Sequence, residues 1–217
     1  DNDYLPVNPG GSWFGDELDV SKWAGVKSVE NGWITDLDFK EIFVGKTLPD
    51  GLFGLEKLES LSLYFNMFGQ NILTTLPDAL GQLQNLWRLN LQHCRLLTSL
   101  PETIGQLKKL THLNLSDCYA LKTLPNSIGQ CQNLESIDLN CCYSLTSLPD
   151  TLLQLNNLES LNVESAHRLM QRSEVVQTLK AKIGSGTYRS IQTDDFGSGS
   201  GSDSGSDSGS DSGSDSG

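Results

Sequence analysis

The sequence predicts an α/β solenoid in which short, similar coils stack into one continuous core. Two observations carry this prediction. The dipeptide Leu-Pro recurs at Leu76, Leu100, Leu124 and Leu148, with a constant step of 24 residues. Within each copy the leucines keep the same register, as in LPETIGQLKKLTHLNLSDCYALKT at 100–123. A copy this short cannot bury its own leucines, so neighbouring copies are expected to stack and share a core.

The pattern LxxLxLxx(N/C)xL in these copies resembles that of plant-type leucine-rich repeat proteins, over about residues 34–166. The resemblance implies one short strand per copy at LxL, and these strands would form a parallel sheet on a concave face. It also implies a return along the convex side through LPxxIGQL, as a turn or a short helix. The strands are expected to centre on six equivalent positions: Asp38, Ser62, Asn90, Asn114, Asp138 and Asn162.

Both ends of such a solenoid need a cover, because an open coil exposes core and a strand edge. Residues 1–33 are assigned to an N-terminal cap, where WAGVKSVENGWITDLDF resembles the entry segment of extracellular plant-type repeats and implies a short hairpin. Residues 167–196 are assigned to a C-terminal cap. There SEVVQTLKAKI predicts an amphipathic helix with Ser173 as N-cap and with Val176, Leu179 and Ile183 on its apolar face, and TYRSIQ predicts an edge strand.

The segment 197–217 is a low-complexity tail of Gly, Ser and Asp alone. It has no apolar side chain to bury, so it cannot supply the energy to order itself. We expect it to tether or coat, and to carry glycans or phosphate on its serines. The alternative is an unmodified flexible linker. The candidate serines are Ser202, Ser204, Ser206, Ser208, Ser210, Ser212, Ser214 and Ser216.

The five cysteines raise the question of a metal site, a redox centre or a disulfide framework. Cys94, Cys118 and Cys142 share one repeat position, which the resemblance turns inward, and Cys131 takes the place of a core leucine. Only Cys141 falls where its counterparts are polar or aromatic. The chain has no CxxC and its three histidines are separated, so zinc is not expected. We predict four packed, unbridged thiols and one exposed thiol.

The resemblance places function on the concave sheet. The residues expected to bind a partner there are Tyr64, Trp87, Arg88, His93, His112 and Asp138. Trp87 and Arg88 are the expected anchor, because aromatic residues and Arg dominate interface energetics. The alternative is a solvated polar face with one exposed Trp. The one N-glycosylation sequon begins at Asn114, on the same face.

Charge and motifs exclude several classes of function. The formal net charge of −12 argues against nucleic acid as a partner, since phosphate binding needs clustered Lys and Arg. No apolar run approaches the roughly 20 residues that span a bilayer. There is no nucleophile elbow, phosphate loop or paired carboxylate site, so neither an enzyme nor a cofactor is expected. The beginning DNDYLPVNPGG shows no signal peptide and fits a mature chain that has lost one.

Two functions from different classes remain open. A short solenoid followed by a Ser/Gly/Asp stalk resembles surface proteophosphoglycans. This resemblance implies an extracellular or cell-surface structural or adhesive module, such as a subunit of a glycosylated coat or filament. Its partner would be a protein, a glycan or further copies of itself. In contrast, LNLSDCYALKTLPNSIGQ resembles the recognition region of intracellular plant-type immune receptors, which implies a cytoplasmic, ligand-sensing domain and explains reduced cysteines.

Overall fold

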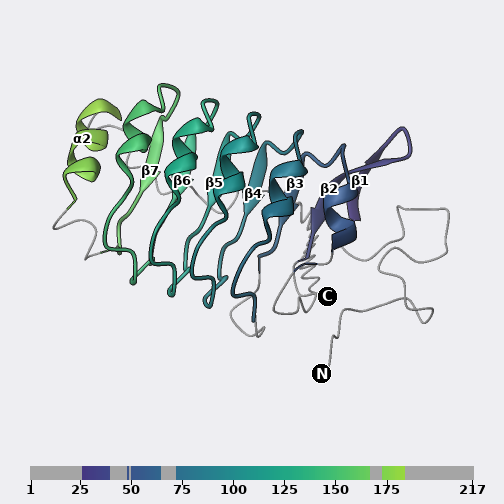
Figure 1. Ribbon diagram of the computed structural model, residues 1–217, viewed down its shortest axis with the longest axis horizontal. Helices are drawn as coiled ribbons and strands as arrows, with labels where there is room; N and C mark the ends of the chain where they lie inside the picture. Colours follow the sequence, from purple (N-terminus) through teal and green to yellow (C-terminus); the bar gives the residue numbers. More distant parts are fainter. Residues whose placement is uncertain (1–25, 40–47, 49, 65–71, 167–172, 184–217) are drawn as a thin grey trace, which may run out of the picture.

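The structure is a computed structural model, and it describes residues 26–39, 48, 50–64, 72–166 and 173–183. One sheet contains the strands in chain order, and from β2 onward neighbouring strands run parallel with equivalent repeat positions side by side. Figure 1 shows the coils stacked in a row. The predicted leucine-rich repeat solenoid is thereby confirmed. The strands are β1 Val26–Glu30, β2 Trp33–Asp38, β3 Ser60–Ser62, β4 Arg88–Asn90, β5 His112–Asn114, β6 Ser136–Asp138 and β7 Ser160–Asn162.

Each coil returns through one turn of 3-10 helix on the side opposite the strands (Figure 1). From η3 onward, each of these helices starts directly after the proline of the Leu-Pro pair, whose backbone is extended. Proline fixes φ and lacks an N–H, so it is well suited to the start of a helix, where that N–H would find no partner. The short helices are η2 Asp50–Gly54, η3 Asp78–Gln82, η4 Glu102–Gln106, η5 Asn126–Gln130 and η6 Asp150–Gln154.

The core is a stack of leucine layers, one for each coil. In the central coil, Ile104, Leu107, Leu110, Leu113 and Leu115 have no exposed surface at all. Their equivalents in the neighbouring coils belong to the same core. Each fully buried leucine contributes about 2 kcal/mol through its burial. Because every layer touches only the layers beside it, the stability of the stack is distributed along the whole solenoid.

The strands end, and do not centre, on the six polar positions, which corrects the expectation from the sequence. Asn90, Asn114, Asp138 and Asn162 each accept a hydrogen bond from the backbone N–H two residues later. This Asx turn directs the chain out of the sheet. As a result the four side chains are 3–7% exposed. The structure therefore leaves little of Asn114 open to a glycan and little of Asp138 open to a partner.

The two ends of the described solenoid match the elements predicted there. Strands β1 and β2 form an antiparallel hairpin, whose turn residues Asn31 and Gly32 have φ of 50° and 82°. Such a turn favours Asn-Gly, because both central residues are left-handed. At the other end, helix α2 (Glu174–Ile183) begins after Ser173, whose Oγ accepts the N–H of Val176 at 3.3 Å. The role of these ends as caps stays a prediction, and TYRSIQ and the tail lie outside the described residues.

Candidate functional site

The repeated cysteines are structural. Cys94, Cys118 and Cys142 are fully buried, and each thiol donates a weak hydrogen bond to a backbone carbonyl of the preceding coil. Burial raises the pKa of Cys142 to about 12 and that of Cys131 to about 11. Thiols with such pKa values stay protonated and unreactive at neutral pH. All five cysteines are free, Cys141 alone being partly exposed, so the predicted packing role of the other four is confirmed.

The first candidate site is a cluster of Trp87, Arg88 and His112 on β4, β5 and the residue before β4, here called the strand-start cluster. The Arg88 guanidinium lies 4.6 Å from the centroid of the Trp87 ring, and the His112 ring meets the same indole edge-on at 5.9 Å. All three side chains are half-buried. Stacking of this kind fixes the rotamers before a partner arrives, so less side-chain entropy is lost on binding.

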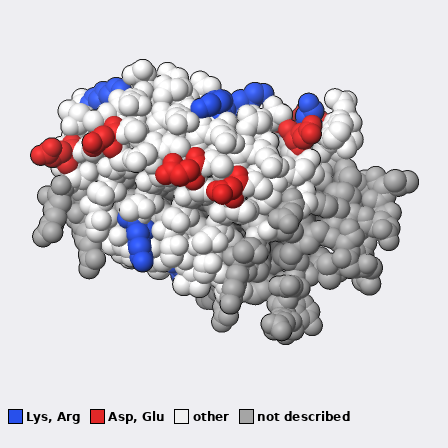
Figure 2. Space-filling view, in the orientation of Figure 1, with Lys and Arg blue, Asp and Glu red and all other residues white. Residues whose placement is uncertain are grey.

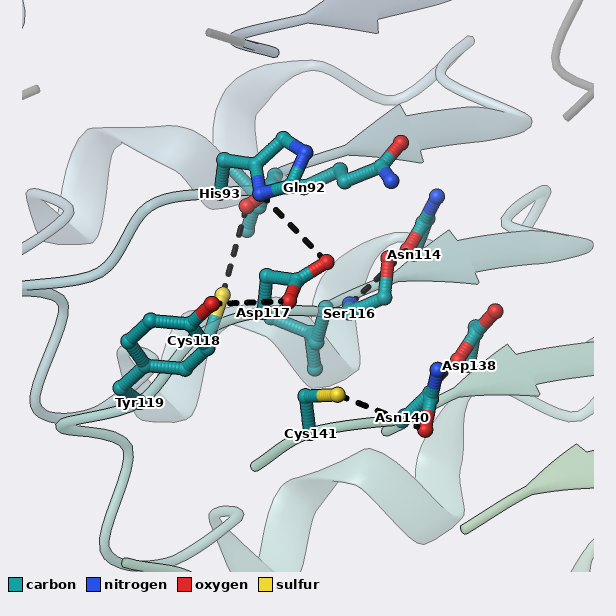
Figure 3. A network of polar contacts seen from close by, with 12 residues as sticks. Gln92, His93, Asn114, Ser116, Asp117, Cys118, Tyr119, Asp138, Asn140 and Cys141 are labelled. Atoms are coloured by element: carbon teal, nitrogen blue, oxygen red, sulfur yellow. Dashed lines mark hydrogen bonds and ion pairs between the residues drawn. The ribbon is translucent and has the colours of Figure 1, made fainter. Parts of the chain in front are cut away.

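The second candidate site lies where the chain leaves the sheet. His93, Asp117 and Cys141 occupy one repeat position there, and all have a left-handed backbone with φ of 60°, 60° and 58°. His and Asp adopt this conformation more readily than most residues. We call these three residues, together with the side chains packed beside them, the turn edge. Figure 3 shows the polar contacts that connect its coils.

Within the turn edge, the surroundings of His93 favour a neutral ring over a fixed cation. Burial lowers its pKa, a nearby Arg95 lowers it further, and only Asp117 raises it. The ring Nδ1 lies 3.4 Å from Asp117 Oδ2, which is an ion pair only when the ring is protonated. Tyr64 packs against the same ring at 5.4 Å. The structure thus brings Tyr64 and His93 together, as two of the six residues predicted from the sequence.

The turn edge also includes a stack that the sequence interpretation missed. Tyr119 and Tyr143 stack at 5.1 Å between ring centroids, and the Arg95 guanidinium lies 5.3 Å from the Tyr119 ring. The Tyr119 hydroxyl donates to Asp117 Oδ1 at 3.1 Å (Figure 3). These three side chains share one repeat position, directly after the buried cysteine. Alignment of the copies could have revealed that position, had loop positions been compared as well as strand positions.

The third candidate site is the β6–β7 end of the concave face. Ser136 and Ser160 are paired in register there, on the face opposite the core residues Ile137 and Leu161. Neither serine hydroxyl has a hydrogen-bond partner among the described residues. Asp138 lies on the same face, where its Oδ2 accepts from the Asn162 amide at 3.3 Å. We call Ser136, Ser160, Asp138 and the exposed Glu135 and Glu159 the serine patch.

The carboxyl group of Asp138 costs stability at neutral pH. Burial raises its pKa above the ordinary value of 3.8, and hydrogen bonds from the backbone N–H of Asn140 and from the Asn162 side chain lower it only in part. A group whose pKa is higher in the folded state binds its proton more tightly there than in the unfolded chain. The contribution of Asp138 to stability therefore falls as pH rises from its ordinary pKa through its folded pKa.

These arrangements suit binding more than bond-breaking chemistry. Cys141 Sγ lies 3.7 Å from Asn140 Oδ1, and the imidazole of His93 is two coils away, roughly 10 Å at the usual strand spacing. Within the described ranges, no three His, Cys, Asp or Glu side chains are placed to hold a metal ion. No helix of these ranges is long and apolar enough to cross a membrane. In the face drawn in Figure 2, most basic side chains lie along the upper edge and the acidic ones form separate groups below it.

The repeat is shared with known proteins. The sequence profile described as "Leucine-rich repeat region" matches residues 37–184. The leucine-rich repeat domain of the type III effector XopL is 29% identical, with a TM-score of 0.45, and the match covers 54% of this chain and 38% of that one. A leucine-rich repeat protein of Leptospira interrogans is 28% identical, with a TM-score of 0.40 and coverage of 62% and 38%. The chain thus spans about two fifths of the length of either protein.

A third solved structure shares the fold alone. A leucine-rich repeat protein of Bacteroides eggerthii is 15% identical, with a TM-score of 0.50, and the match covers 72% of this chain and 42% of that one. Curated protein sequences contain no match. The family profile covers more than half of the chain, and the structure repeats the coil that the profile describes. The chain belongs to the leucine-rich repeat family, whose domains are modules for protein–protein interaction.

Proposed function

We propose that the chain is a non-catalytic module that binds a protein partner on its concave sheet, with the strand-start cluster as anchor. The observation that carries this proposal is the preassembled contact of Trp87 with Arg88 and His112, at 4.6 and 5.9 Å. Half-buried Trp and Arg side chains held by neighbours have the character of interface hot spots. The cluster also lies on β4 and β5, in the middle of the parallel strands.

More specifically, we propose that this module has an extracellular structural or adhesive role, as a subunit of a surface coat or filament. The hairpin at the start of the sheet supports this form, because β1 and β2 pair as expected for a segment whose sequence resembles the entry of extracellular repeats. The Ser/Gly/Asp tail supports it by composition. In this role the partner is another copy of the chain, a different protein or a glycan.

The tail gives this finer form a direct test. We expect the native protein to have a larger mass than its sequence, by the mass of glycans or phosphates attached to the serines between Ser202 and Ser216. Intact mass spectrometry of protein from its natural source, followed by mapping of the tail peptide, measures this difference. A tail peptide at the bare mass of its sequence would leave the tail as a linker and remove this support.

A second candidate function is a ligand-sensing domain of a receptor in a reducing compartment. One observation favours it: all five cysteines of the chain are free, and secreted proteins of this kind more often carry disulfides. The mass spectrum described above separates the two candidates. An unmodified tail together with five titratable thiols would favour the receptor domain, whereas a modified tail would favour the surface module.

Replacing Trp87 and Arg88 together by alanine tests the anchor. We expect the dissociation constant for the partner to rise about 30-fold, which corresponds to about 2 kcal/mol. The immobilised full chain is first used to retain a partner from extracts of the source cells. Biolayer interferometry with the purified partner then compares the wild type with W87A/R88A.

The turn edge provides a matched control for this measurement. The variant R95A/Y143A removes one Arg and one aromatic residue from outside the strands and should change the dissociation constant less than threefold. Circular dichroism would confirm that both variants fold. If R95A/Y143A loses the partner and W87A/R88A keeps it, the binding surface is the turn edge and the proposed anchor is wrong.

A further inference from the structure

Two hydroxyl groups on the concave face lack the partners that buried polar groups normally have. Ser136 is 7% exposed, and the Oγ atoms of Ser136 and Ser160 are buried without a hydrogen bond among the described residues. Most buried side-chain hydroxyls in folded proteins are hydrogen-bonded, so each exception needs an explanation. The two serines face each other across β6 and β7. Their two hydroxyl oxygens are therefore neighbouring acceptors with no hydrogen bond among the described residues.

The residue before each of these serines is an exposed glutamate. Glu135 and Glu159 directly precede the two serines, and their backbones are joined by a hydrogen bond of 2.8 Å from Glu159 N to Glu135 O. Neither carboxylate makes an ion pair or a side-chain hydrogen bond with another described residue. The repeat also predicts where the side chain of Glu135 lies. Trp87 holds the equivalent position two coils earlier, and its ring contacts His112, the equivalent of Ser160.

Asp138 is the buried member of the patch, at a position where several other coils have an amide. The equivalent residues in three other coils are Asn90, Asn114 and Asn162, and these side chains and that of Asp138 accept the same hydrogen bond from the backbone. The first two coils have Asp38 and Ser62 at this position. Asparagine would keep this turn without the desolvation that raises the pKa of Asp138. Because Asp138 is 6% exposed and both of its oxygens accept hydrogen bonds within the fold, the carboxylates that a partner can reach at the patch are those of Glu135 and Glu159.

We infer that the serine patch holds the cationic group of a lysine or arginine side chain that the protein partner supplies. This inference rests on the proposed function, because it names the chemistry of the partner on the same concave face. The hydroxyl oxygens of Ser136 and Ser160 would accept from an ammonium or guanidinium N–H. The carboxylates of Glu135 and Glu159 would neutralise its charge.

The chemistry of the patch selects this ligand over the alternatives. An anion would meet the exposed carboxylates of Glu135 and Glu159, and the described strands β6 and β7 have no Lys or Arg to offset them, so it would be repelled. An apolar side chain would leave both hydroxyls without partners, at a cost in desolvation. A metal ion does not fit, because no group of three His, Cys, Asp or Glu among the described residues is placed to hold one. An ammonium group has three donors and a full charge, and it satisfies both the hydroxyls and the carboxylates.

The distance between the strand-start cluster and the serine patch predicts the spacing of two residues in the partner: the one that contacts Arg88 and the basic one that enters the patch. Arg88 lies on β4, and Ser136 and Ser160 lie on β6 and β7, which are two and three strand spacings away, roughly 10–14 Å. An extended chain rises about 3.3 Å per residue. A partner segment that crosses the strands would thus place its basic residue about three or four positions from the residue that contacts Arg88.

Titration of the full chain with acetyl-tetralysine amide tests the inference, with acetyl-tetraglutamate amide as the probe of opposite charge. Amide shifts in NMR spectra of the labelled protein are expected to change saturably at Ser136 and Ser160 with the lysine peptide and not with the glutamate peptide. The variant E135Q/E159Q should bind the lysine peptide about tenfold more weakly. The variant S136A should weaken binding severalfold and leave the melting temperature unchanged, because its hydroxyl has no bond to lose.

A variant of equal net charge separates the site from general attraction to an acidic protein. D78N/E102Q removes two carboxylates from the first turns of η3 and η4, on the opposite side of the coils, and should weaken binding less than twofold. Equal losses in D78N/E102Q and E135Q/E159Q would overturn the inference, because the peptide would then sense only net charge. Binding that does not saturate, or shifts elsewhere than β6 and β7, would overturn it as well.

The outcomes also separate this inference from the proposed function. If tetralysine fails to bind while W87A/R88A still loses the native partner, the inference is wrong and the proposed anchor stands. If tetralysine binds at the serine patch while W87A/R88A keeps the native partner, the cation site stands and the proposed anchor is wrong. The lysine peptide itself should bind W87A/R88A with unchanged affinity, because its site lies on other strands.

Discussion

Replacing Gly105 by alanine is expected to lower the free energy of unfolding by about 3 kcal/mol, as forced overpacking of a close-packed site does. A Cβ at this position would lie 2.5 Å from the backbone oxygen of Ser127 and 2.8 Å from the Ser127 Cβ. Ser127 belongs to η5 of the next coil, and its N–H donates to Glu102 Oε2 at 3.2 Å. The clash is mainly with backbone, so no rotation of a flexible side chain can relieve it.

Urea unfolding of G105A measures this loss, and Gly54 provides the matched control. Gly54 also lies in a short return helix, but a Cβ there would meet no atom within 4 Å. G54A is expected to change stability by less than about 1 kcal/mol, since only the conformational entropy of the unfolded chain changes. If the two variants unfold at the same urea concentration, the coils are less tightly stacked at the return helices than the structure indicates.

The residue at the repeat position of Gly105 differs between the middle and the two ends of the solenoid. The equivalent residues are Gly81 and Gly129 in the neighbouring coils, and each faces the return helix of the next coil. At the two ends of this series the position holds Phe53 and Leu153. Phe53 belongs to the repeat at 48–75, which is four residues longer than the 24-residue copies. Leu153 belongs to the last coil, which is followed by helix α2 in place of another coil. A bulky residue here therefore marks a change in the stacking.

Most of the fold follows from the sequence because it depends on local periodicity. The 24-residue step places the strands from β4 to β7 at equivalent positions, and the hairpin and α2 follow from their own turn and capping residues. The step also identifies Cys94, Cys118 and Cys142 as one packed column. These features need only the residues of one coil and the knowledge that the coils stack.

The surface sites are less predictable because they depend on neighbours in adjacent coils. Asp138 alternates with core residues and so was expected to be open, but the turn that follows each strand covers it. The pairing of Tyr119 with Tyr143 depends on how the loops leave the sheet. The hydroxyls without partners at Ser136 and Ser160 are visible only when every nearby donor and acceptor has been placed.

Replacing Leu113 by alanine in the central strand β5 is expected to cost about 3–4 kcal/mol, the usual range for a leucine truncated in a core. Leu113 has no exposed surface, and it pairs in register with Leu89 on one side and Ile137 on the other. A cavity at this point would loosen the layers on both sides, because each coil is held only by its neighbours. Leu96, 47% exposed, is the matched control, and L96A should change stability by less than about 0.5 kcal/mol.

The shape of the L113A unfolding curve also shows whether the solenoid unfolds as one cooperative unit. If L113A unfolds in one step with a lower midpoint and an unchanged slope, the solenoid folds as a unit and the cavity is felt throughout it. A curve that splits into two steps would mean that β5 joins two halves of separate stability. In that case the strand-start cluster and the serine patch would lie on either side of the boundary, and L113A would weaken a partner that must contact both. A loss equal to that of L96A would show that Leu113 is not the core residue that its burial indicates.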